Sequence, residues 1–299
     1  MKIIDFSTQF PDEQSCREHF RDSRIRHGII CKKCGSTKHY WLQNRWQFKC
    51  KQCDFRTTLR SGTVMEHSNL PIRAWYVAMC FMTSTKKGIS ACELQRQLGI
   101  SQYVTVWKLM HKIRAMMGKC DDKYKLKDSV EFDEGFFSVA ISSKDRNKLK
   151  RGKGSERQVN VAVLAESVPL EDIETGKQNK FCGHFKLKIM TNQKSEAVDA
   201  IFNQYVNTNS IVFSDMALHY KGIENNTEQH IKEKSTKETT AKFLKWVHIA
   251  IANAKRNFLG VYHHLKAQFL QNYLDEFSYK LNRRFRNNML DLLIFSGIY

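Results

Sequence analysis

Long apolar segments are missing from this sequence. No run approaches the ~18 apolar residues that a membrane-spanning helix needs, and the N-terminal MKIIDFSTQFPDEQ becomes acidic before it forms the apolar core of a signal peptide. We therefore expect a soluble, cytoplasmic protein with no membrane partner. In that reducing compartment, the nine cysteines are not expected to form disulfides.

Negative charge is also scarce. The 299 residues contain 49 Lys and Arg against 30 Asp and Glu, which gives a net charge of +19. Such an excess, spread over every segment, indicates a polyanionic partner, most often nucleic acid. The alternative is a basic protein without a polyanionic partner. The 41% of hydrophobic residues suffices for real cores, and the length predicts two or three modules.

Four of the cysteines have the spacing of a metal site. They form two CxxC turns, Cys31–Cys34 and Cys50–Cys53, and residues 39–50 can form a hairpin that brings the turns together. Four thiolates in a tetrahedron suit structural Zn²⁺. A thioredoxin-like redox pair is disfavoured because there are two pairs and no βαβ pattern around either. The remaining cysteines are predicted to be buried thiols: Cys16, Cys80, Cys92, Cys120 and Cys182.

Residues 54–122 have the periodicity of helices. Ser90 begins a capping box for a helix over 90–98, Gly99 makes a turn, and a second, basic helix follows over 104–116. This is the pattern of a helix-turn-helix, although an ordinary αα-hairpin has the same pattern. In a chain this basic we favour DNA binding. The basic side chains expected on the exposed side of the second helix are Lys108, Lys112 and Arg114.

After a linker at 123–129, the pattern changes to strands. Strands are predicted at 129–139, 159–165, 185–190 and 211–215, with a helix at 195–206 before the last of them and helices at 243–258 and 266–285 after it. The order β-β-β-α-β fits an RNase H-like fold. We therefore predict a multi-domain α+β protein with three parts: an N-terminal segment and zinc ribbon (1–60), a helical helix-turn-helix region (61–122) and an RNase H-like α/β catalytic domain (123–299).

Two of the predicted strands carry an acid. Asp133 lies near the middle of the first strand, and Asp215 ends the fourth. Carboxylates are preferred ligands of Mg²⁺, and two Mg²⁺ or Mn²⁺ ions about 3.5–4 Å apart can activate the nucleophile and stabilise the leaving oxygen of a phosphodiester. We expect both acids to hold such ions, with a third ligand from the helix after strand four. Glu134 is expected to face away, because adjacent residues on a strand point to opposite faces.

Together these features resemble the ISXO2-like insertion-sequence transposases, which join an N-terminal zinc ribbon and a helix-turn-helix to a DDE-type catalytic domain. The resemblance implies a transposase that binds the terminal inverted repeats of its element and catalyses metal-dependent DNA cleavage and strand transfer. It also implies double-stranded DNA as partner, at least a dimer on that DNA, and Asp133 and Asp215 as the first two catalytic acids. Its marks cover nearly the whole chain: the four cysteines, 88–94 with 106–107, 130–134, 213–215, 247–253, 260–264, 273–277 and 282–284.

The third catalytic position departs from the Asp-Asp-Glu pattern. Five residues after His248, where many members have Glu, this chain has Asn253. We expect Asn253 as the third ligand of an Asp-Asp-Asn variant, with His248 as the alternative. The departure also permits an inactive copy. Glu276 is expected to cap the last helix or to pair with Arg283 or Arg284, and not to replace the missing acid.

DNA contacts are expected in three places. The loop at 143–154 is rich in Gly, Lys and Arg and lies beside the catalytic strand, which favours contact with a phosphate backbone over a solvated surface loop. The residues assigned to DNA are Lys108 and Lys112 of the basic helix, Lys148, Lys150, Arg151 and Lys153 of the loop, and Lys255 and Arg256 after the third catalytic position.

Two other functions stay open. A non-catalytic DNA-binding regulator would use the ribbon and the helix-turn-helix while the C-terminal domain only dimerises, but it would not need the strand-end acids. A different RNase H-like nuclease would use the acids, but such enzymes usually lack the two N-terminal modules.

Overall fold

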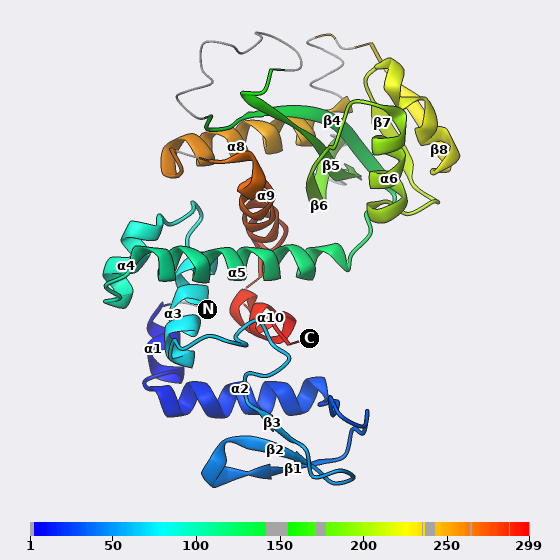
Figure 1. The fold of residues 1–299 in the computed structure, drawn as a ribbon. Coiled ribbons are helices and arrows are strands. Elements are labelled where there is room, and N and C mark those ends of the chain that lie inside the picture. The colour runs from blue at the N-terminus through cyan, green and yellow to red at the C-terminus, as the bar shows by residue number, and fades with distance from the viewer. Residues whose placement is uncertain are drawn as a thin grey trace. The chain divides into compact units, whose positions relative to one another are not determined.

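The computed structural model describes residues 3–141, 155–171, 178–234, 236, 243–263, 265–286 and 288–298. The chain divides into two compact units: an N-terminal unit, Met1–Cys120 with Phe285–Tyr299, and a sheet unit, Asp121–Arg284. Both units combine helices with strands (Figure 1), so the protein is a mixed α+β chain. In the described part of the chain, no helix is long and apolar enough to cross a membrane.

Two helices begin the N-terminal unit, α1 (Ile3–Gln9) and α2 (Glu13–His27). α2 begins after Asp12, whose Oδ1 accepts a hydrogen bond from Ser15 N at 2.8 Å. This cap satisfies one of the backbone N–H groups that the first turn leaves unpaired.

A three-stranded antiparallel sheet follows. Its order is β1-β2-β3, and its elements are β1 (His39–Leu42), η1 (Gln43–Arg45), β2 (Gln47–Cys50) and β3 (Arg56–Thr58). The pairing of β1 with β2 confirms the predicted hairpin. β3 shows that the helical prediction for residues from 54 onward was wrong at its start. Thr57 pairs with Phe48 and both are buried, so this segment extends the sheet and helices resume only at Ile72.

Arginines on α2 fasten the hairpin to the rest of the unit. Three guanidinium groups on one side of the helix lie over three aromatic rings, at distances that are typical of cation–π contacts. The pairs are Arg17 with Trp46 at 5.7 Å, Arg21 with Trp41 at 6.0 Å and Arg24 with Phe48 at 5.5 Å. The Arg24 guanidinium also donates to the carbonyl oxygens of Thr58 and Leu59. The sheet therefore has a packed face in addition to its cysteines.

Three helices complete the predicted helical region: α3 (Ile72–Ser84), α4 (Ala91–Leu98) and α5 (Tyr103–Asp122). The Ser90 hydroxyl accepts from Glu93 N at 3.1 Å, as predicted for the start of α4. Gly99 adopts a left-handed φ of 64° and ends that helix, which glycine does without steric penalty.

The exposed side of α5 differs in part from its prediction. Lys108 and Lys112 are exposed, but Arg114 is 1% exposed, so its predicted exposure was wrong. The Lys112 ammonium donates to the Glu66 carbonyl at 3.4 Å and lies 5.9 Å from the Trp75 ring centroid. Lys112 thus contacts its own unit as well as solvent.

The last helix, α10 (Met289–Ser296), packs against α2 and α3 of the N-terminal unit. Val64 N donates to Gly297 O at 2.9 Å, and a Cβ on Gly297 would lie 2.4 Å from Met116 Sδ. Glycine therefore lets the chain end close onto this unit. The three-part division 1–60, 61–122 and 123–299 stays a prediction, and it assigned this tail to the C-terminal part.

The sheet unit is built on five strands in the order β6-β5-β4-β7-β8. They are β4 (Ser129–Ser138), β5 (Gln158–Glu171), β6 (Gln178–Ile189), β7 (Ile211–Ser214) and β8 (Gln229–Lys232). β4, β5 and β6 pair antiparallel, whereas β7 pairs parallel with both β4 and β8. The four predicted strands are present. β8 was not predicted, because QHIK is too short and polar to show a strand pattern.

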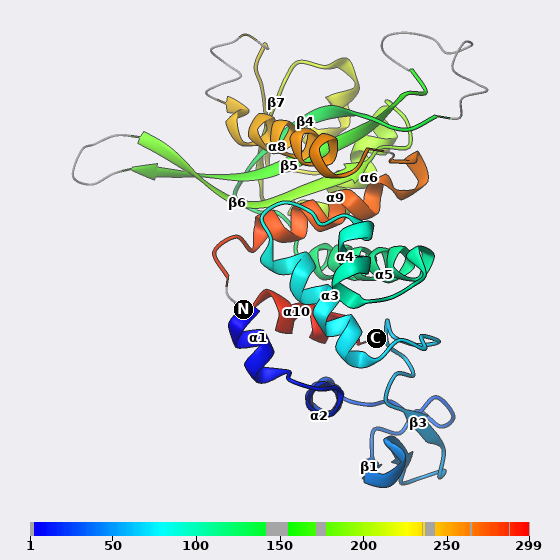
Figure 2. The same cartoon turned by 90° about the vertical axis from the view of Figure 1, so that its left-hand side faces the viewer.

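Helices cover both faces of this sheet. One face carries α6 (Ser195–Tyr205) and the 3-10 helix η3 (Leu218–Asn225), and the other carries α8 (Lys245–Val261) and α9 (Ala267–Asn282). Figure 2 shows α8 beside β4 and β5. Side chains alternate between the two cores along β4: Phe132 lies in the first and Phe137 in the second.

A buried carboxylate fixes the segment that leads into the sheet. Glu166 on β5 accepts hydrogen bonds from the Tyr124 hydroxyl at 2.7 Å, from Lys127 N at 3.0 Å and from His184 N at 2.8 Å. Burial alone would raise the pKa of Glu166, but hydrogen bonds from His184 and Tyr124 lower it below 4.5. The predicted linker at 123–129 is therefore tied to the sheet by a charged acceptor.

Candidate functional site

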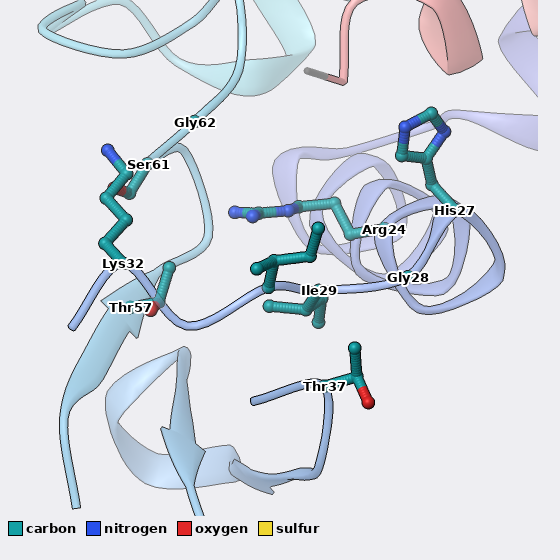
Figure 3. Close-up of a pocket in the computed structure, with 10 residues that line it drawn as sticks. Arg24, His27, Gly28, Ile29, Lys32, Thr37, Thr57, Ser61 and Gly62 are labelled. Carbon is teal, nitrogen blue, oxygen red and sulfur yellow. The ribbon is translucent and has the colours of Figure 1, made fainter. Parts of the chain in front are cut away.

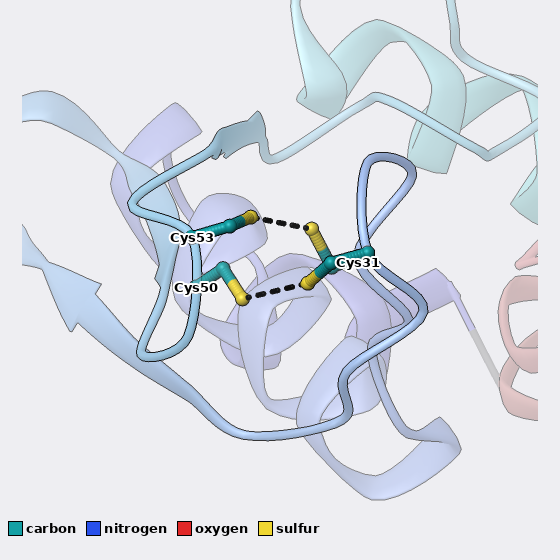
Figure 4. A group of neighbouring side chains, drawn as sticks. Cys31, Cys50 and Cys53 are labelled. Atoms are coloured by element: carbon teal, nitrogen blue, oxygen red, sulfur yellow. Dashed lines mark hydrogen bonds between the residues drawn. The ribbon is translucent and has the colours of Figure 1, made fainter.

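The four predicted zinc ligands meet in the N-terminal unit. Their Sγ atoms all lie within 4.8 Å of one another, with Cys31 and Cys53 3.6 Å apart and Cys34 and Cys50 also 3.6 Å apart. Thiolates bound tetrahedrally about 2.3 Å from zinc lie roughly 3.8 Å apart, so the cluster has the dimensions of a zinc site. Figure 4 shows Cys31, Cys50 and Cys53 turned toward one point.

The other cysteines fit their prediction only in part. Cys16, Cys80 and Cys182 are buried, as expected. Cys92 is exposed and Cys120 is half-buried, so the prediction was wrong for these two. Both lie on helices that show a polar side to solvent.

A cavity of about 470 Å³ lies next to the zinc ribbon, between the end of α2 and the segments at 28–37 and 57–62. Figure 3 shows Arg24 extending from α2 toward the 57–62 segment. Arg24 is already bound by two backbone carbonyls, and Lys32 pairs with Glu66 at 2.9 Å. These two cations of the cavity therefore serve the fold of the unit.

Asp133 lies on the face of the sheet that α8 covers, and Asp215 follows the neighbouring strand. Along β4, Glu131, Asp133 and Phe137 share that face. Glu131 is paired with Phe213 in the parallel register of β4 and β7. Asp133 lies two residues further along β4, and Asp215 directly follows Ser214, the last residue of β7, near enough for its negative charge to act on Asp133.

The charge on Asp133 is unfavourable in this setting. Burial raises its pKa above 3.8, and the negative charges of Asp215 and Glu134 raise it further. The Glu134 N–H, which donates to Asp133 Oδ1 at 2.7 Å, and the His248 ring oppose that rise. Clustered, partly buried carboxylates of this kind gain free energy when a cation is bound between them.

Helix α8 is anchored to β4 by a second buried acid. Glu131, which is fully buried, accepts hydrogen bonds through Oε2 from Trp246 N at 2.7 Å and Val247 N at 3.2 Å, at the start of α8. Burial raises the pKa of Glu131, and hydrogen bonds with Ser167, Val247 and Trp246 oppose that rise by stabilising the carboxylate. Sequence reasoning missed Glu131, although its position two residues before Asp133 placed both on one face.

The anchored helix presents one stripe of residues to β4. His248 Nε2 lies 3.6 Å from Asp133 Oδ2, Ile251 lies against Gly135, and Lys255 Nζ lies 5.7 Å from the Phe137 ring centroid. The two elements thus run side by side from the acid site to the end of the strand.

Asn253 lies outside that stripe. It is five residues beyond His248, which is a rotation of about 140° around a helix of 3.6 residues per turn. Its side chain is exposed, and its Oδ1 accepts from Arg256 Nη2 at 2.9 Å. Of the two predicted third ligands, the structure brings His248 and not Asn253 into contact with Asp133.

Glu134 lies on the opposite face, as expected. Its carboxylate accepts a hydrogen bond from Asn160 Nδ2 at 2.5 Å and pairs with His219 at the start of η3. These contacts are structural, because they link β4 to β5 and to η3. Glu276 differs from its prediction: it contacts the Tyr262 hydroxyl and Lys280.

Behind Asp215, a serine and a histidine fix the strand end. The Ser214 hydroxyl donates to Asp215 O at 2.9 Å, and His230 Nε2 lies 2.7 Å from the same hydroxyl. Burial lowers the pKa of His230 to about 4, so the ring is neutral and donates through Nε2. No sequence signal pointed to His230, because its strand was not predicted.

The residues assigned to DNA are distributed unevenly. Lys255 and Arg256 are exposed on α8, and Lys108 and Lys112 are exposed on α5. The four basic residues of the loop fall outside the described residues: Lys148, Lys150, Arg151 and Lys153.

Comparison with known proteins identifies the family. Residues 125–282, more than half of the chain, match the model of the ISXO2-like transposase domain, and residues 11–55 match that of the transposase zinc-ribbon domain. The chain belongs to the ISXO2-like transposase family. The predicted resemblance is thereby confirmed, and the match to the zinc-ribbon domain supports a structural Zn²⁺ site at the four-cysteine cluster.

Two further proteins are similar to this chain. The uncharacterized protein in transposable element ISH50 of Halobacterium salinarum is 25% identical over 177 residues, which are 57% of this chain and 58% of that relative. The Drosophila P element transposase strand transfer complex aligns with 95% of this chain and 69% of the other, at 11% identity and a TM-score of 0.26. A likeness that weak carries no argument about fold or activity.

Proposed function

We propose that this transposase binds the terminal inverted repeats of an insertion sequence and catalyses metal-dependent DNA cleavage and strand transfer in its sheet unit. The observation that carries the proposal is the contact between His248 Nε2 and Asp133 Oδ2 at 3.6 Å, together with the negative charge of Asp215 nearby, which raises the pKa of Asp133. Three antiparallel strands followed by two parallel ones, with helices on both faces, support an RNase H-like fold.

Asp133 and Asp215 would hold two Mg²⁺ or Mn²⁺ ions. Such ions supply an activated nucleophile and stabilise the leaving oxygen of a phosphodiester. The chain would supply carboxylate oxygens on a partly buried surface. Burial, and to a smaller extent the charges of Asp215 and Glu134, raise the pKa of Asp133, and a bound cation would offset both effects.

For the third ligand, the contact with Asp133 favours His248 over Asn253. A neutral imidazole adds no negative charge, and it suits Mn²⁺ better than Mg²⁺, since nitrogen is a softer donor than carboxylate oxygen. His248→Ala is therefore expected to reduce strand transfer more than Asn253→Ala. Equal losses, or a larger loss for Asn253→Ala, would return the assignment to Asn253.

The N-terminal unit would bind the DNA ends. α4, the Gly99 turn and α5 support a helix-turn-helix, with Lys108 and Lys112 exposed on its second helix. The zinc ribbon would add phosphate contacts, and Lys255 and Arg256 would hold the DNA near the acids. Strand transfer between two element ends further implies a homo-oligomer on DNA.

The deciding experiment is strand transfer with purified protein, Mg²⁺ or Mn²⁺, and duplexes that carry the element's ends. Asp133→Asn and Asp215→Asn are each expected to lower joining by about 10³-fold, the loss of several kcal/mol of metal-dependent stabilisation, while end binding survives. Full joining by either variant would refute the site. Wild-type protein that binds ends but joins none would instead support a non-catalytic regulator or an inactive copy.

A further inference from the structure

A second cavity opens in the sheet unit where β4 and α8 run past the acid site. Its volume is about 820 Å³, within the usual range of ligand pockets. Residues from the end of β4, from the start of β5 and from the last turns of α8 line it, among them Phe137, Arg157, Lys255, Phe258, Leu259 and Tyr262.

The lining combines one accessible aromatic ring with a cationic rim. Phe137 and Phe258 are 2% and 6% exposed and pack behind the cavity with ring centroids 5.9 Å apart, whereas Tyr262, which continues this layer, is half-buried and offers its ring to the cavity. Lys255 and Arg157 are exposed at the opening. Aromatic rings bind the face of a nucleobase, and cations bind the phosphate attached to it.

The Tyr262 ring is held in place without a ligand. The Tyr262 hydroxyl donates to Glu276 Oε2 at 3.3 Å, and its ring lies 4.6 Å from that of Tyr273. Glu276 is 3% exposed on α9, so the anchor is part of the core. A ring that is already fixed loses little conformational entropy when a base stacks on it.

The cavity lies further along β4 and α8 than Asp133 and His248. From Asp133 to Phe137, β4 advances about 13 Å, and from His248 to Lys255, α8 advances roughly 10 Å. A DNA strand whose phosphate lies at the acids therefore reaches the cavity with a neighbouring nucleotide, not with the scissile one.

An apolar side chain stands at the rim of the cavity. Leu259 is 78% exposed on α8 and borders the cavity. Apolar side chains placed next to a duplex commonly enter the base stack and replace stacking contacts there.

We propose that this cavity takes up a nucleobase that leaves the DNA stack beside the scissile phosphate, and that Leu259 fills the gap. The proposal rests on the proposed function, since it assumes that DNA ends reach Asp133. It assigns the substrate class of the cavity as an unstacked base of the element end.

The test places 2-aminopurine, one position at a time, on both sides of the cleavage site in end duplexes. Binding of the Asp133→Asn protein is expected to raise its fluorescence several-fold at one position, because unstacking relieves quenching. Leu259→Ala in the same background should lose that rise and bind intact ends about tenfold more weakly. Leu218→Ala is the matched control, because Leu218 is equally exposed, at 81%, in the same unit but outside the cavity.

An abasic nucleotide at the responsive position should restore tight binding to Leu259→Ala, since no base then has to leave the stack. The proposal is overturned if no position brightens on binding, or if Leu218→Ala abolishes the signal as Leu259→Ala does. A weaker-binding Lys255→Ala variant without any fluorescent position would mean that the rim contacts phosphates only. These readouts need no strand transfer, so they fail or succeed independently of the proposed activity.

Discussion

The zinc ribbon and the acid site gather their side chains in opposite ways. All four zinc ligands come from one short segment, Cys31 to Cys53, and two tight turns aim them at a single point. Asp133 lies on β4 and Asp215 directly after β7, with β5, β6 and α6 between the two strands in the chain, and the parallel pairing of β4 with β7 brings the two acids near each other.

This difference decides what each site depends on. The ribbon needs its metal, because four neighbouring thiolates repel each other without a cation. The acid site needs its scaffold: Glu131 fixes the start of α8, and α8 brings His248 to Asp133. We therefore expect the zinc site to unfold when its metal is removed. The acid site, in contrast, should be lost when packing contacts far from it in the chain are removed.

The largest effect is expected from breaking the ribbon. Cys31→Ser should release zinc and unfold the segment 31–58, because structural zinc contributes about 10–16 kcal/mol to the folding of comparable small modules. End binding should fall at least about tenfold as phosphate contacts are lost. Zinc content and limited proteolysis measure the outcome, with the exposed Cys92→Ser as control. Unchanged zinc content would refute the ligand assignment. Unfolding of the sheet unit in the same variant would show that the zinc site is not local to the ribbon.

The second-largest effect is expected at Glu131, and it tests whether the acid site depends on the packing of α8 against β4. Glu131→Ala leaves the N–H groups of Trp246 and Val247 without their acceptor, at a cost of about 1–3 kcal/mol, and strand transfer should fall because His248 shifts. Glu131→Gln keeps an acceptor oxygen and removes a buried charge whose pKa is raised by burial, so it should restore most stability and joining. Urea unfolding measures the stability of each variant, and joining assays measure its strand transfer. A glutamine variant as defective as the alanine variant would mean that hydrogen bonding at α8 is not the cause.

A third test concerns Glu166, another buried carboxylate of the sheet unit. The pKa of Glu166 is lowered by folding, so its contribution to stability is present above the usual value near 4.5 and is lost as the pH falls through the folded pKa. Glu166→Gln should destabilise the protein by about 1–3 kcal/mol at pH 7, and the difference should shrink below pH ~4.5. Denaturation at several pH values measures this, with the exposed Glu228→Gln as control. A pH-independent difference would mean that ionisation of Glu166 does not matter.

The smallest effect is expected from removing one cation–π contact between α2 and the zinc ribbon. Arg21→Ala removes one cation–π contact, that with Trp41, and should destabilise the N-terminal unit by about 0.5–1 kcal/mol. Zinc should remain bound, because the four thiolates do not involve this face. Thermal unfolding with a parallel zinc measurement separates the two. Loss of zinc from this variant would show that the aromatic face, and not the cysteine spacing, sets the metal site.

Prediction from sequence succeeded where a pattern is local. The CxxC spacing, the hairpin at 39–50 and the Gly99 turn depend on neighbours in the chain, and all are present. β8 and the contact of His230 with Ser214 had no local signal, because parallel pairing with β7 makes a strand of a short polar segment.

The sequence by itself determined the family, the zinc ligands and the strand on which Asp133 lies. Only the tertiary structure decided how α8 lies against β4, and with it that His248 meets Asp133 while Asn253 points elsewhere. The physical reason is that helix periodicity gives the spacing of faces but not which face is buried. Here the buried apolar residues of α8 and the hydrogen bonds of its first turn to Glu131 fix the face that α8 turns to the sheet.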